Sequence, residues 1–396
     1  MKKLLTPLKM LVTAFILYLI FQRFQIGWGD VTEALSNSSP GWWILSMGTQ
    51  FLAIFFSIQR WNVLLKGQNL IIPFGHLMST YMVGRFLGTF TPTGVGLEAY
   101  KAYDIARYSG KTTESVAVVF IEKTVVTFLS LSFLVIVSLF FIELAPTFLY
   151  AFFTFFGVLL VLALVLLFQP GLISKILLIN FPGKNKIEGI LKNAVESITM
   201  YSKNRAPLAI SLFFGILVYL SLFSTFYTNS RALGVPEPTT GTIEKVLLNE
   251  ETRKEFQALN IEFVDLEKET AAGDGAVAEV LLSENEKTSL ASKGITPMEG
   301  SEHRVGRKGL SLRDVYIVGP LTQIATMIPL SIAGIGLREG AFSGLLESLG
   351  IWLGPKTILT ATMWYFVSIS INIIGAILFL ARKTEYAETI SKMKKG

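Results

Sequence analysis

Two short stretches of the sequence combine glycines with charged residues in a pattern that suits anion binding. One is Thr-Pro-Thr-Gly-Val-Gly-Leu-Glu-Ala-Tyr at 91–100, and the other is Pro-Leu-Ser-Ile-Ala-Gly-Ile-Gly-Leu-Arg-Glu-Gly-Ala-Phe at 329–342. Each has a proline, then Gly-Val/Ile-Gly-Leu, then a glutamate within two residues. Arg338, beside free backbone N–H groups at a positive helix end, would make a receptor for a phosphate oxygen.

Other charged residues surround these two stretches. Glu98 and Lys101 are three residues apart, so they would share one helical face and can pair. Glu122 and Lys123 are adjacent and diverge by about 100° on a helix, so each needs a different partner, and Arg338 and Glu339 have the same spacing. The expected substrate-binding residues are Arg85, Pro92, Gly94, Gly96, Glu98, Lys101, Glu122, Lys123, Pro329, Gly334, Gly336, Arg338 and Glu339.

A purely structural interpretation of these residues stays open. The charges could be buried pairs that tie helices together, Arg85 and Lys101 could be ordinary cytoplasmic anchors, and the glycines could permit close helix packing. Two similar glycine stretches with matching charged neighbours favour a binding site more than one stretch would.

The composition places these residues in a membrane protein. The chain has 396 residues, of which 51% are hydrophobic and only 16% are charged, and its mean hydropathy is +0.54. There is no cysteine and there are two histidines, so we expect no disulfide, thiolate catalysis or metal centre. No nucleotide-binding motif is present, so any energy for transport must come from gradients or from substrate consumption. We expect no cofactor and no nucleic-acid partner.

The sequence predicts a polytopic α-helical protein with about six full spans, since several apolar runs reach the roughly 20 residues that a bilayer core needs. Two further segments, 74–110 and 314–354, are predicted to be re-entrant hairpins. If both halves of the second hairpin cross the membrane fully, the chain has eight crossings instead of six. The predicted spans are 4–24, 42–65, 115–144, 148–168, 206–228 and 356–380.

Lys and Arg in the short loops predict the orientation. Both termini and residues 60–111 and 171–205 are basic, so we expect both termini to be cytoplasmic, in the cell membrane. The two hairpins would then enter from opposite faces. Opposed broken elements are typical of an inverted-repeat transporter with its substrate site near the midplane.

The distribution of charged residues along the chain predicts its domain organisation. The membrane domain is predicted in two parts, 1–235 and 310–385, with a basic cytoplasmic tail at 386–396. Between the parts, 236–309 holds fifteen Asp/Glu and nine Lys/Arg and no span. Its pattern predicts a small extracytoplasmic α/β insert of βαββαβ order, with strands at 243–248, 261–266 and 277–282, helices at 250–259 and 284–292, a short last strand and a flexible tether at 300–309.

Three pieces of sequence carry a family resemblance. They are Arg85-Phe-Leu-Gly-Thr-Phe-Thr-Pro-Thr-Gly-Val-Gly-Leu-Glu-Ala-Tyr100, Ile121-Glu-Lys123, and the run from Pro329 to Glu339. Over 1–235 and 310–385 the chain resembles the membrane domain of the lysylphosphatidylglycerol synthase/flippase family. Where that family usually has a Glu-Arg pair, Lys123 stands for the arginine and offers a point charge instead of a planar fork.

The resemblance implies movement of an anionic phospholipid or a polyprenyl-phosphate-linked saccharide between leaflets. The aminoacyl-transferase domain of the bifunctional members is not seen, so we do not expect this chain to lysylate lipids or to be an enzyme. We expect Arg338, Arg85 and Lys101 to contact phosphate, and Glu98, Glu122 and Glu339 to neutralise them when the site is empty and to be able to carry protons.

Two alternatives belong to other classes. A membrane-embedded lipid-modifying enzyme would use Glu98 or Glu339 as a base, but no nucleophile or metal cluster accompanies them. A receptor or scaffold would act through the 236–309 insert and an extracytoplasmic partner. The expected partners of the membrane part are lipids with phosphate headgroups.

Overall fold

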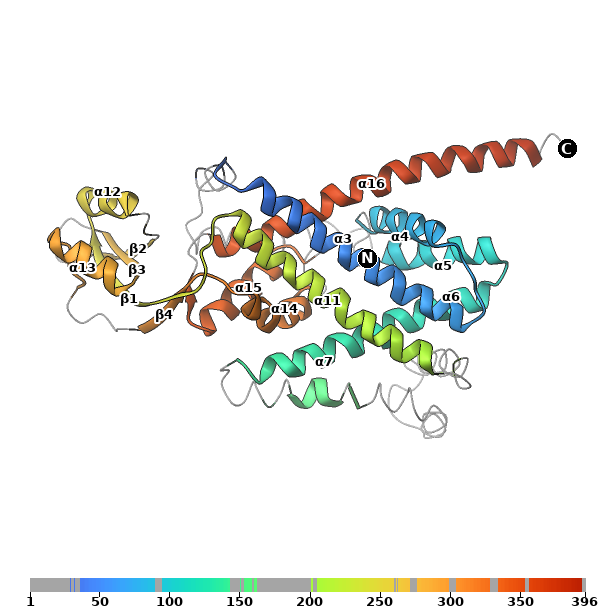
Figure 1. The fold of residues 1–396 in the computed structure, drawn as a ribbon, viewed down its shortest axis with the longest axis horizontal. Coiled ribbons are helices and arrows are strands. Elements are labelled where there is room, and N and C mark those ends of the chain that lie inside the picture. The colour runs from blue at the N-terminus through green and yellow to red at the C-terminus, as the bar shows by residue number, and fades with distance from the viewer. Residues whose placement is uncertain are drawn as a thin grey trace, which may run out of the picture. The chain divides into compact units, whose positions relative to one another are not determined.

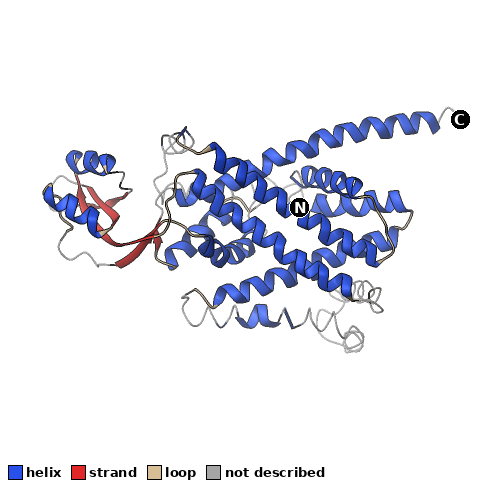
Figure 2. Cartoon of the chain, in the orientation of Figure 1, coloured by secondary structure: helices blue, strands red, loops and turns tan. Residues whose placement is uncertain are grey.

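The protein is described by a computed structural model, built of α-helices and one five-stranded sheet (Figures 1 and 2). The chain forms two compact units, a first unit of Met1–Ser46 and Phe223–Tyr365 and a second unit of Met47–Leu222 and Phe366–Gly396. The structure describes residues 36–89, 95–142, 153–158, 160–161, 205–259, 263–270, 276–298, 304–327, 334–352 and 356–393, and residues 29, 32, 150, 201 and 261.

Three long helices match predicted spans. They are α3 (Pro40–Gly67), α11 (Ala206–Ala232) and α16 (Lys356–Met393). Within the described residues, Pro40–Gly67, Ala206–Ala232 and Lys356–Arg382 are long and apolar enough to cross a membrane. The predicted spans 4–24 and most of 148–168 lie outside the described residues, so the number of six spans stays a prediction.

The predicted span 115–144 is not one regular α-helix. It consists of α6 (Thr112–Ile121), the π-helical stretch η1 (Glu122–Val126) and α7 (Thr127–Leu139). The wider turn forms because the backbone N–H and the hydroxyl of Thr127 both donate to the carbonyl of Glu122, the latter at 2.8 Å. The sequence missed this change of helix type, which falls on the predicted Glu122–Lys123 pair.

Each glycine stretch connects two helices that pack against each other, and its second half forms the first turns of the second helix. The first stretch follows α4 (Phe74–Thr89) and runs into α5 (Val95–Ser109), and the second follows α14 (Leu312–Met327) and runs into α15 (Leu337–Ser348). Two short helices were predicted for 74–110, and the structure has them. Pro92, Gly94 and Pro329 lie outside the described residues.

The insert has the predicted order of elements. It contains β1 (Thr239–Leu248), α12 (Glu250–Ala258), β2 (Phe263–Thr270), β3 (Ala276–Leu282), α13 (Glu284–Ser292) and β4 (Arg304–Lys308). The strands are antiparallel, in the order β2-β3-β1-β4. Apolar residues on one face of the strands pack with those of the helices: Val246, Leu248, Phe256, Ile261, Ala278, Val280, Leu282 and Leu290.

An ion pair with a buried carboxylate lies in the insert. The Glu244 carboxylate, 1% exposed, is 2.8 Å from the ammonium group of Lys287. The hydrogen bond to this carboxylate raises the pKa of Lys287.

The predicted tether at 300–309 is wrong for 304–308, which form strand β4. On one side β4 pairs with β1, and on the other it pairs in parallel with β5 (Ile351–Trp352), which follows α15. The backbone N–H of Arg307 donates to the carbonyl of Gly350 at 2.7 Å, and the Arg307 guanidinium is 2.5 Å from Asp314 of α14. The sheet of the insert therefore includes a strand from the segment that follows the second glycine stretch.

Candidate functional site

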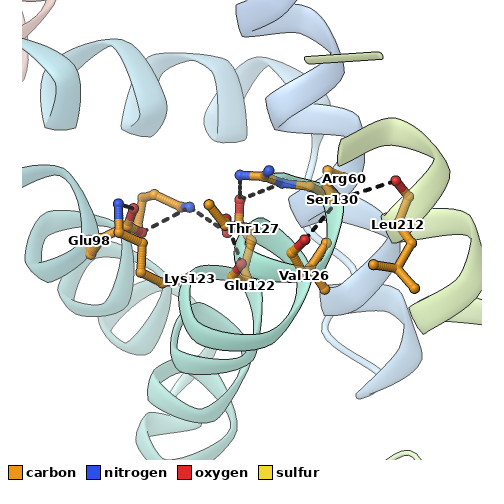
Figure 3. Close-up of polar contacts among 9 residues, drawn as sticks. Arg60, Glu98, Glu122, Lys123, Val126, Thr127, Ser130 and Leu212 are labelled. Atoms are coloured by element: carbon orange, nitrogen blue, oxygen red, sulfur yellow. Dashed lines mark hydrogen bonds and ion pairs between the residues drawn. The ribbon is translucent and has the colours of Figure 1, made fainter. Parts of the chain in front are cut away.

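Glu122 is the centre of a buried ion-pair network in the second unit (Figure 3). Its side chain is almost fully buried, at 1% exposed. One carboxylate oxygen accepts from Arg60 of α3, at 2.9 Å from Nη2 and 3.2 Å from Nε. The other oxygen accepts from the Lys101 ammonium of α5 at 2.5 Å. Both oxygens are thus held by cations from two different helices.

The network continues from Lys101 to the surface. The Lys101 ammonium is 3.3 Å from one Glu98 oxygen, and the Lys123 ammonium is 3.6 Å from the other. The Lys123 side chain is 56% exposed. Glu98 and Lys101 pair as their spacing predicts, and Glu122 and Lys123 have different partners. Three cations alternate with two carboxylates, which leaves a net charge of one positive.

The surroundings of Lys101 explain how its charge is buried. Its ammonium lies 4.7 Å from the Trp61 ring centroid and 5.7 Å from that of Tyr81, within cation–π range. Ion pairing and aromatic faces together compensate for the lost hydration. Arg60 was missed as a member of the site, although a lone arginine inside the apolar α3 was a usable signal.

Arg85 does not join this network. The half-buried Arg85 guanidinium donates to Asn372 Oδ1 and to Ser368 Oγ of α16, each at 3.1 Å. No carboxylate lies within ion-pair distance of Arg85 among the described residues. Gly96 is the second residue of α5. Arg85 of α4 therefore bonds to polar groups of α16, and the structure shows no ion pair between it and Glu98 or Glu122.

A second polar cluster, which the sequence did not predict as a site, surrounds Asp104 of α5. The buried carboxylate accepts from the Thr80 hydroxyl and lies 3.0 Å from Arg382 and 2.9 Å from His76. These contacts join α4, α5 and the end of the apolar part of α16. The Asp104 carboxylate thus has Arg382 and His76 as basic neighbours, an arrangement that suits a packing contact between these helices.

The first unit contains the second glycine stretch. Gly334 and Gly336 have φ of 76° and 84°, in the left-handed region, and α15 begins directly after them. A Cβ at Gly334 would lie 2.8 Å from the Cβ of Thr326, so a larger residue does not fit. Glu339 returns to cap the helix, because its Oε2 accepts from the N–H of Gly336 at 2.7 Å.

Arg338 is buried there, and no described carboxylate forms an ion pair with it. It is 5% exposed, and its Cζ lies 3.9 Å from the Trp364 ring centroid and 4.4 Å from that of Tyr365, both on α16. Nη1 of Arg338 has no hydrogen-bond partner among the described residues, and neither has Oε1 of Glu339. As the adjacent positions predict, the two side chains diverge and form no ion pair. An open guanidinium N–H at the start of a helix is suited to an oxyanion.

The predicted site residues thus form two groups. Arg85, Gly96, Glu98, Lys101, Glu122 and Lys123 are in the second unit, and Gly334, Gly336, Arg338 and Glu339 are in the first. Within the described part of the chain, no group of three or more His, Cys, Asp or Glu could hold a metal ion.

Comparison with known protein families shows which family the chain belongs to. A family model described as the lysylphosphatidylglycerol synthase TM region matches residues 8–248. The chain belongs to this family. The match confirms the predicted resemblance, makes the protein a member of a transmembrane family linked to lipid handling, and includes the first glycine stretch with Glu122 and Lys123. The second stretch lies beyond the matched residues, and no curated protein matches the chain.

Proposed function

We propose that the protein is a flippase that moves a phosphate-bearing lipid between the two leaflets, and that Arg338 binds the phosphate. The observation that carries the proposal is a buried arginine whose Nη1 has no partner among the described residues, at a helix start formed by two left-handed glycines. A buried charge of this kind is expensive in a membrane and is kept where it has a function. Membership of a lipid-handling membrane family supports the same conclusion.

The environment of Arg338 suits a transient ligand. Trp364 and Tyr365 hold the guanidinium by its face, which leaves its edge N–H groups for hydrogen bonds. A phosphate can use these N–H groups together with backbone N–H groups of α15. By contrast, the Glu122 network has its cations already paired, so we assign it to holding α3, α5 and η1 together.

The finer topology belongs to this proposal. The two helix pairs around the glycine stretches would be re-entrant hairpins from opposite faces of the cell membrane, as in an inverted repeat. Both termini would be cytoplasmic and the insert extracytoplasmic, where a partner could reach it. The lipid would leave the protein chemically unchanged, as expected of a transporter and not of an enzyme.

The proposal is tested by leaflet exchange in proteoliposomes. Fluorescent phosphatidylglycerol in both leaflets is bleached from outside with dithionite, and the fraction that becomes accessible over time is measured. Wild type should expose the inner pool. Arg338→Ala should slow exchange about tenfold or more, because charged hydrogen bonds are lost, and Arg338→Lys should retain part of it.

The matched control is Arg313→Ala. Arg313 is an exposed arginine on α14 of the same unit, and its removal should leave exchange unchanged. Size-exclusion profiles establish that each variant is folded. Equal exchange by wild type and folded Arg338→Ala would end the assigned role of Arg338, and exchange no faster than in protein-free vesicles would end the proposed transport of this lipid. Mass spectrometry of the recovered lipid would reveal an enzyme by an altered product.

A further inference from the structure

The three glutamates of the predicted site differ in how their charge is balanced. Both oxygens of Glu98 and both oxygens of Glu122 lie beside Lys or Arg nitrogens. Glu339 is as deeply buried as Glu122, at 1% exposed, and its Oε2 accepts from the backbone N–H of Gly336 instead of from a cation. Its Oε1 has no hydrogen-bond partner among the described residues. Of the three, Glu339 is therefore the one whose ionised form is least stabilised by cations.

Few ionisable groups face the Glu339 carboxylate among the described residues, so its charge can change when it gains a proton. Arg338 and Tyr365 are the ionisable groups that face it, and the hydroxyl of Thr362 lies beside it. In α14 and in the part of α11 that belongs to the same unit, the other ionisable residues have different neighbours or lie at the surface. Asp314 pairs with Arg307, Tyr316 with Ser224, Tyr227 with Glu237, and Arg231 with Glu237 and the carbonyls of Val235 and Leu310, while Arg313 is exposed.

The carboxylate of Glu339 also occupies the place that a bound anion would take. It accepts from an N–H at the start of α15, beside the helix end that favours negative charge. A phosphate that docks on Arg338 and on this helix end would compete for the same N–H group. Two anions cannot share such a buried place at low cost unless one of them is neutralised.

We infer that Glu339 takes up a proton when a phosphate headgroup binds at Arg338, so that the lipid and the proton bind together. This inference rests on the proposed function. No covalent bond changes, because the proton comes from water and adds to a carboxylate oxygen of Glu339 that the phosphate displaces from Gly336. By linkage, lower pH then strengthens phosphate binding by the same factor as phosphate strengthens proton binding. A proton gradient across the membrane would thereby drive the movement of the lipid between the leaflets.

The test is calorimetric and needs no transport. Water-soluble dihexanoyl phosphatidylglycerol is titrated into the full-length protein in detergent, in two buffers of different ionisation enthalpy, between about pH 5 and pH 9, the range in which buried carboxyls titrate. Wild type should take up close to one proton per lipid bound at the upper end of this range. Its affinity should fall about tenfold for each pH unit above the pKa of Glu339.

Two variants test whether Glu339 is the residue that takes up the proton. Glu339→Gln should bind with an affinity that does not depend on pH and should take up no proton. Glu347→Gln, an exposed glutamate two turns further along α15, should behave as wild type. If Glu339→Gln does not fold, the proton count of wild type and of Glu347→Gln still decides the coupling.

The outcomes separate the inference from the proposal beneath it. Lipid binding without proton uptake at every pH would overturn the inference and leave the flippase proposal standing. Proton uptake that persists in folded Glu339→Gln would overturn the assignment to Glu339. No binding by wild type would overturn both the proposed phosphate site and this inference.

Discussion

At the scale of single residues, buried charges occur in two kinds of environment. Glu122 and Lys101 are held in an alternating network and compensate each other, whereas Arg338 has aromatic faces and an open N–H group. The first arrangement is expensive to break, and its charges are already paired with one another. The second keeps a hydrogen-bonding group available, which is the property that a binding residue needs.

The network predicts a contrast between two lysines. Lys101→Met should destabilise the protein by about 3–5 kcal/mol, because it leaves the buried Glu122 carboxylate with Arg60 alone. Lys123→Met, which removes the 56% exposed end of the same network, should cost only about 0–1 kcal/mol. Thermal unfolding in detergent compares them, and similar melting temperatures for the two variants would contradict the assigned structural role of Lys101.

At the scale of elements, helix packing depends on particular glycines. In the second unit, a Cβ on Gly375 of α16 would overlap the carbonyl oxygen of Met82 in α4. This close approach brings α16 beside the helix that carries Arg85, whose guanidinium bonds to Ser368 and Asn372. The close packing of α4 on α16, which brings Arg85 to Ser368 and Asn372, therefore requires a glycine at position 375.

Gly375→Ala should accordingly lower stability by about 1–3 kcal/mol, since the clash is with backbone and not with a movable side chain. Gly48→Ala is the control, because a Cβ added to Gly48 of α3 would have no other atom within 4 Å. That change should be neutral or stabilise by about 0.5–1 kcal/mol. Thermal melting of both variants measures the difference, and a Gly375→Ala variant as stable as wild type would refute the close packing of α4 and α16.

At the scale of the whole chain, the absence of cysteine makes the proposed orientation testable. Asn285 of α13 and Lys111 before α6 are both exposed. In intact cells a membrane-impermeant maleimide should label Asn285→Cys, in the insert, and should not label Lys111→Cys. After permeabilisation both should react, which shows that Lys111→Cys is accessible. The opposite pattern in intact cells would invert the proposed topology.

Much of this protein can be predicted from its sequence, because the relevant signals are local. Apolar runs of sufficient length predict the three helices α3, α11 and α16, and alternation with turn residues predicts the βαββαβ order of the insert. The glycine stretches and the Glu-Lys pair likewise indicate the family, and the match over residues 8–248 confirms it.

Only the tertiary structure decides which charges are satisfied. Arg60 and Glu122 are 62 residues apart, and Arg338 meets Trp364 and Tyr365 from another helix. Strand β5 has two residues and becomes visible only through its pairing with β4. Such contacts depend on how helices and strands pack, which the period of a single segment does not encode. For this reason the sequence gives Glu98, Glu122 and Glu339 the same predicted role. The fold distinguishes Glu339, because its Oε1 has no hydrogen-bond partner among the described residues.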